Sequence, residues 1–127
     1  QSPAAIIVNL PSNDAAAHVS VAEQLDNFAR VAKAAADAGV LLWITTPQPR
    51  NFSPAQVAIQ REVRSAILNR YSSYSLDFWS PFAAADGTID PKYDAGDGVH
   101  LNAAAHSILL KIVVSAKVPE AVLAAAK

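Results

Sequence analysis

The sequence predicts an α/β protein with a parallel sheet, because strand-like apolar runs alternate with helical patterns along the chain. Continuous apolar runs cover residues 4–10 and 40–46, and a shorter one covers 74–79. Runs of this kind, with no alternation of polar residues, are typical of strands that are buried on both faces. The crossovers between parallel strands are right-handed, so helices should cover the sheet.

Each predicted element has a recognisable start or stop. The run at 4–10 ends in turn-forming residues at 11–14, which predict a loop. Helical spacing of apolar residues follows over 20–38, with Ser20 and Glu23 placed as a capping box and Gly39 as the stop. Two prolines end the run at 40–46, and Ser53-Pro54 opens a helix that fades near Tyr71. A loop over 80–98 leads to a long helix at 103–116 and a short final helix at 119–127.

Composition limits the classes of function. The 127 residues suit one domain, and a hydrophobic share of 52% supplies a core. With ten basic and eleven acidic residues, the chain has no basic face for nucleic acid. No apolar run reaches the roughly 20 residues that span a bilayer. The chain has neither cysteine nor methionine, and the missing methionine predicts a trimmed product or the later part of a longer polypeptide.

The stretch from Gly96 to Asn102 is the strongest candidate for chemistry. Asp97 and His100 lie three residues apart, between a glycine turn and a helix that Asn102 can cap. At this spacing the carboxylate can fold back on the imidazole and fix its tautomer, as the orienting residue of a nucleophilic triad does. The same residues also fit a glycine turn and a helix start without chemistry.

These motifs resemble those of the SGNH (GDSL-type) hydrolases. Asp97-Gly98-Val99-His100 resembles the last block of that family, Asp-x-x-His, and Ser12-Asn13-Asp14 resembles its Gly-x-Asn-Asp block. The resemblance implies a three-layer α/β/α fold with a parallel, flavodoxin-like sheet. It also implies an esterase in which His100 is the base, Asp97 orients it, and Asn13 donates to the oxyanion. No cofactor or metal is required by that chemistry.

The chain departs from the family pattern in two ways. Pro11 stands where the family has glycine, and because proline fixes φ we expect a changed loop there. The Gly-Asp-Ser block with the nucleophile is absent, and no other serine lies at a strand-to-helix turn between glycines. Residues 1–127 are therefore expected to be the C-terminal part of one such domain, lacking its first two strands. The expected partners are the N-terminal half, as a separate chain or upstream segment, and a small ester.

Two further residues are candidates for substrate contact. Arg50 follows a strand end and could meet an anionic or sugar substrate, although it could equally brace a loop through backbone carbonyls. Trp79, at another strand end, could line a substrate cleft. Asp86, Asp90 and Asp94 share a loop, but their spacing fits turn residues better than calcium ligands.

Three interpretations follow from these observations. The first is an esterase for short-acyl or carbohydrate acetyl esters, to which this chain contributes all of the triad except the serine. The second is a non-catalytic α/β binding module or pseudoenzyme with the same ancestry. The third is a swapped oligomer, since an open sheet edge invites another copy.

Overall fold

A parallel sheet of three strands forms the middle layer of the computed structural model, which describes residues 3–125. Its strands are β1 (Ala5–Val8), β2 (Leu41–Thr45) and β3 (Ser75–Leu76), in the spatial order β1-β2-β3. Ile44 of the central strand is in register with Val8 on one side and Ser75 on the other. The predicted α/β class with a parallel sheet is confirmed.

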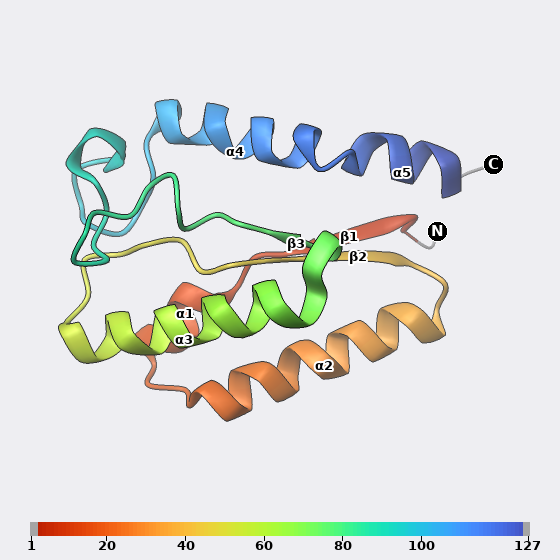
Figure 1. Cartoon of the computed structure of the whole chain (residues 1–127), viewed down its shortest axis with the longest axis horizontal. Coiled ribbons are helices and arrows are strands. Elements are labelled where there is room, and N and C mark those ends of the chain that lie inside the picture. Colours follow the sequence, from red (N-terminus) through yellow and green to blue (C-terminus); the bar gives the residue numbers. More distant parts are fainter. Residues whose placement is uncertain (1–2, 126–127) are drawn as a thin grey trace.

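Helices cover both faces of this sheet (Figure 1). On one face lie α2 and α3, and on the other lie α4 and α5. This is the expected three-layer α/β/α arrangement. The helices are α1 (Pro11–Ala16), α2 (Val21–Asp37), α3 (Pro54–Tyr71), α4 (Ala103–Ser115) and α5 (Val118–Ala125), with short 3₁₀ turns η1 (Ser72–Tyr74) and η2 (Pro91–Tyr93).

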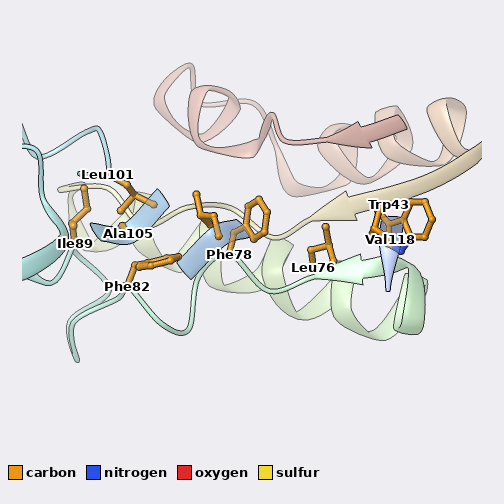
Figure 2. Packing of buried hydrophobic residues seen from close by; sticks show 9 residues of the cluster. Trp43, Leu76, Phe78, Phe82, Ile89, Leu101, Ala105 and Val118 are labelled. Carbon is orange, nitrogen blue, oxygen red and sulfur yellow. The ribbon is translucent and has the colours of Figure 1, made fainter. Parts of the chain in front are cut away.

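The central strand separates two hydrophobic clusters. Successive side chains of a strand point to opposite faces, and Trp43 and Ile44 accordingly belong to different clusters. Ile44 packs with side chains of α2 and α3. Trp43 shares the larger cluster with Leu76, Phe82 and residues of α4 and α5 (Figure 2). The core is therefore completed by the loop after β3 as well as by helices.

Capping residues begin the helices at the predicted positions. Ser20 accepts the backbone N–H of Glu23 at the start of α2. Ser53 and Gln56 form a complete capping box at the start of α3, and Asn102 caps α4. After α2 the chain turns at Gly39, whose φ of 67° is the left-handed conformation that glycine favours.

Strand β1 is not buried on both faces, in contrast to the prediction. Ile6 and Ile7 are 36% and 41% exposed, and Leu10, beyond the strand, is 61% exposed. The reason is topological, because β1 is an edge strand and within residues 3–125 only β2 pairs with it.

Two other predictions need correction. The loop predicted at 11–14 is the helix α1, which Pro11 begins as its first residue and two alanines end. The strand predicted at 74–79 is reduced to Ser75–Leu76. It ends early because the Asp77 carboxylate accepts the N–H groups of Trp79 and Ser80, which turns the backbone. Of the final helix predicted at 119–127, residues 126–127 lie outside the described residues.

Candidate active site

All three strands point to the same side of the molecule, the left in Figure 1, and the segments that follow them lie on that side. The segment from β1 into α1, the segment from β2 into α3 and the long loop after β3 all leave from this edge. Asn13, Arg50 and His100 belong to these three segments, as the sequence predicts. Ligands of open parallel sheets bind at this edge.

Asp97 and His100 contact each other directly. The imidazole Nδ1 lies 2.6 Å from Asp97 Oδ2, while Asp97 Oδ1 accepts the N–H groups of Val99 and His100 at 2.9 and 2.8 Å. The hydrogen bond with the His100 ring, followed by those from the two N–H groups, lowers the pKa of the Asp97 carboxyl below its usual range. An ionised carboxylate can only accept hydrogen bonds, so His100 Nδ1 carries the proton.

The other ring nitrogen of His100 is available for chemistry. The His100 side chain is 75% exposed, and Asp97 is its one side-chain partner within residues 3–125. With the proton on Nδ1, the Nε2 lone pair can accept a proton from a hydroxyl and later return it. The local geometry is that of a base with its orienting carboxylate. No serine of the described residues forms a hydrogen bond with it.

A second aspartate holds the turn that carries Asp97. Asp94 Oδ1 accepts the N–H groups of Gly96, Asp97 and Gly98 at 2.8, 3.2 and 3.0 Å. Asp86 and Asp90 bind nearby backbone N–H groups in the same way. These contacts confirm the interpretation of the three loop aspartates as turn residues. Among residues 3–125 no group of three His, Asp or Glu side chains is placed to hold a metal ion.

Asn51 is a site residue that sequence analysis missed. Its N–H donates to Gly98 O at 2.8 Å, and its Oδ1 accepts the N–H of Ile89 at 3.1 Å. A Cβ at Gly98 would lie 2.7 Å from Asn51 Nδ2, so the two residues are in close contact. Asn51 thus joins the segment after β2 to the loop of His100. The one signal for Asn51 in the sequence is its position directly after the Pro-Gln-Pro-Arg segment that ends a predicted strand.

Asp77 organises the carboxyl end of β3. Its carboxylate accepts from Arg64 Nη2 at 2.8 Å and from Ser80 Oγ at 2.7 Å, and Thr46 Oγ1 donates to it at 3.3 Å. Burial alone raises the pKa of Asp77, but the hydrogen bonds from Arg64, Ser80 and Trp79 outweigh it and lower the pKa to about 2. The network fixes the start of the loop that leads to His100.

The remaining predicted site residues differ in the solvent exposure of their side chains. Asn13 is exposed on α1, where its side chain makes no hydrogen bond with residues 3–125 and is free to donate. Arg50 is half-buried, with its guanidinium 4.9 Å from the centre of the Phe52 ring. Trp79 is only 6% exposed, so its ring is part of the interior and offers little surface to a substrate. The structure brings Asp97 and His100 together and leaves the roles of Asn13, Arg50 and Trp79 as predictions.

Among the helices of residues 3–125, none has the length and apolar character needed to cross a lipid bilayer.

Comparison with known proteins relates the chain to others by structure. No protein-family model matches the sequence, and no curated protein does. A GDSL-like lipase from Bacteroides thetaiotaomicron VPI-5482 superimposes with a TM-score of 0.78 at 19% identity, over 90% of this chain and 62% of the lipase. A proposed acylhydrolase from Bacteroides fragilis NCTC 9343 superimposes with a TM-score of 0.74 at 17% identity, over 94% of this chain and 63% of the other.

The chain therefore spans less than two thirds of the length of either structure. Identity below 20% in both cases makes the likeness one of fold. The resemblance predicted from the Asn-Asp and Asp-x-x-His motifs is confirmed at that level, and the chain has a partial fold of the GDSL-like hydrolase type.

Proposed function

We propose that this chain is the base-carrying part of a serine-type carboxylic ester hydrolase. The observation that supports this most is the Asp97–His100 contact at the carboxyl edge of a sheet with a GDSL-like hydrolase fold. In the proposed reaction a serine hydroxyl loses its proton to His100 Nε2 as it attacks the ester carbon. His100 then protonates the leaving alcohol, and water repeats the cycle on the acyl-enzyme. Short-acyl or carbohydrate acetyl esters are the proposed substrates.

Asn13 is the proposed oxyanion donor. It lies on α1, directly after β1, and its amide has no partner within residues 3–125. An amide N–H aimed at the developing oxyanion lowers the barrier by roughly 3 kcal/mol in other hydrolases. Arg50 and Trp79 are proposed only as supports of the surrounding loops, because Arg50 stacks on Phe52 and Trp79 is buried.

The serine is proposed to come from a segment that docks on the open edge of β1. Exposed apolar side chains gather there, on β1 and the adjacent face of α2: Ile6, Ile7, Leu10 and Val31. A hollow of about 550 Å³ along this edge is lined by Val8, Leu10, Phe28 and Asp14, the residue next to Asn13. A strand added here would cover the apolar surface, and the longer GDSL-like structures contain additional chain.

Two measurements on the native material test the proposal. A denaturing intact-mass spectrum shows whether a second polypeptide with a Gly-Asp-Ser segment accompanies this chain, and a serine-directed phosphonate shows whether an activated serine is present. In the assembled protein, His100→Ala should reduce ester turnover by about 10³-fold or more. His106→Ala is the matched control, because His106 is an exposed histidine on α4 outside the site. Equal turnover of the two variants contradicts the proposal.

A second candidate function is a non-catalytic binding module. It is favoured by one observation, namely that no serine among residues 3–125 forms a hydrogen bond with His100. Failure of the phosphonate to label any polypeptide in the native preparation would favour it.

The proposed docking of the serine-carrying segment on β1 is tested by Ile7→Lys. This variant should prevent assembly with that segment, while Leu110→Lys on exposed α4 should not.

A further inference from the structure

A cavity lies beside the candidate active site, between the first turns of α3 and the turn at residues 86–88. Its volume is about 460 Å³, within the range of small-molecule sites. The wall from the segment before α3 and from α3 itself is apolar, with Phe52, Pro54, Val57 and Ala58. The opposite wall carries polar groups of Asp86 and Thr88.

This cavity adjoins the His100 loop through Asn51. Phe52 follows Asn51 in the chain, and Thr88 precedes Ile89, whose N–H donates to Asn51 Oδ1. Asn51 also binds Gly98, two residues from His100. Asn51 therefore lies between the cavity and the His100 loop and is hydrogen-bonded to residues next to both.

The turn that carries Asp86 and Thr88 packs tightly against α3. A Cβ at Gly87 would lie 2.4 Å from Val57 Cγ1 and 3.3 Å from Trp79 Cζ2, so only glycine fits between these side chains. Val57 and Trp79 are themselves buried. This packing holds the turn beside α3, while Ala58 and Pro54, which also line the cavity, are exposed.

One cation faces this hollow. Arg61 Nη2 donates to Ala85 O at 2.9 Å, which uses one of its five N–H groups. Within residues 3–125 Arg61 forms no salt bridge. The hydrogen bonds from Thr88 to Asp86 Oδ1, at 2.9 and 2.7 Å, and with a smaller effect the charge of Arg61, lower the pKa of the Asp86 carboxyl in the same cavity. Arg61 therefore retains donors for an anionic or hydrogen-bond-accepting group.

We propose that this cavity favours the short-acyl class of ester and binds its acyl chain, whose far end carries a carboxylate or another acceptor that meets Arg61. The identity of the ligand as part of an ester rests on the proposed function, whereas binding itself does not. The cavity lies outside the Asp97–His100 pair, so occupancy can be measured without turnover.

The test is a titration of this chain with hexanoate and with hexanol, followed by amide ¹H–¹⁵N chemical shifts. Both probes should shift the resonances of Val57, Ala58 and Thr88. Arg61→Gln should weaken hexanoate binding by about tenfold, as expected for loss of a charge-assisted hydrogen bond, and should leave hexanol nearly unchanged.

Filling the cavity provides the decisive variant. Ala58→Trp places an indole from the exposed face of α3 into the hollow and should weaken both probes by about tenfold or more. Ser65→Trp is the matched control, exposed on the same helix two turns away. Unchanged affinity in Ala58→Trp, or shifts confined to the hollow around Phe28, overturns the proposal.

The same titration separates this proposal from the proposed function. His100→Ala should bind both probes as tightly as the unmodified chain. If the assembled protein lacks ester turnover while the cavity still binds hexanoate, the esterase proposal fails and the binding site stands.

Discussion

Replacing Asp77 by asparagine should destabilise the protein at neutral pH and remove part of its sensitivity to acid. The carboxylate lies at the end of β3, where Arg64 Nη2 and Ser80 Oγ donate to its Oδ2 at 2.8 and 2.7 Å. The asparagine side chain would keep the volume and one acceptor oxygen but lose the negative charge opposite Arg64. The variant therefore tests the electrostatic part of the interaction.

The expected size follows from the pKa of Asp77. Burial raises it, and the bonds from Arg64, Ser80 and Trp79 lower it to about 2 from an ordinary value of 3.8. At about 1.4 kcal/mol for each pH unit, this difference corresponds to about 2.5 kcal/mol. Asp77 and Arg64 are 30% and 28% exposed, and solvent screening reduces the expected effect to about 1–2 kcal/mol.

The sign of the pH dependence is fixed by the direction of the shift. A folded-state pKa below the unfolded value stabilises the protein above pH 3.8, and this stabilisation is lost as the pH falls towards about 2. Urea unfolding at pH 7 and at pH 2.5, followed by circular dichroism, measures it. The difference between the unmodified chain and Asp77→Asn should shrink at the lower pH.

A surface ion pair supplies the control for this experiment. Asp37 pairs with Lys33 at 2.6 Å, but the two side chains are 65% and 75% exposed. Asp37→Asn should therefore change the free energy of unfolding by less than about 0.5 kcal/mol. A cost of Asp77→Asn no greater than that of Asp37→Asn, or one that is the same at both pH values, would contradict this electrostatic role of Asp77.

Three further predictions concern local structure, each measured by urea unfolding. Gly98→Ala should cost about 1 kcal/mol more than Gly39→Ala, because φ is 68° and 67° at the two glycines but only at Gly98 would the Cβ meet Asn51; equal costs would contradict the close contact. Asn102→Ala should cost about 1–2 kcal/mol, since Asn102 caps α4 and also donates to the backbone of η2; a cost near zero would mean that water replaces the cap. Phe82→Ala should cost about 3–5 kcal/mol, because Phe82 is fully buried in the larger cluster; a smaller loss would show that the loop after β3 contributes little to the core.

Much of the fold was predictable because its signals are local. A cap requires a side chain two or three residues from the N–H groups that it satisfies, and Ser20, Ser53 and Asn102 were recognised on that basis. The Asp97–His100 contact is of the same kind, because its partners are three positions apart. The alternation of strands and helices was sufficient for the parallel sheet.

The predictions that were wrong concern segments whose surroundings are not local. The apolar character of β1 predicted burial on both faces, but an edge strand is buried only where a neighbour covers it. The turn-forming residues at 11–14 predicted a loop, but Pro11 at the first helical position begins α1 there. The strand predicted at 74–79 ends early because the Asp77 carboxylate accepts backbone N–H groups of the residues that follow it.

The helix starts and the pairing of Asp97 with His100 follow from residues a few positions apart, and the α/β class follows from the order of apolar runs along the chain. The contacts of Asn51 with Gly98 and Ile89, the ion pair of Arg64 with Asp77, and the cavity near Asn51 depend on the tertiary structure. These contacts link loops that leave different strands. Their geometry is set by how the sheet aligns the strand ends, which no spacing along the chain specifies.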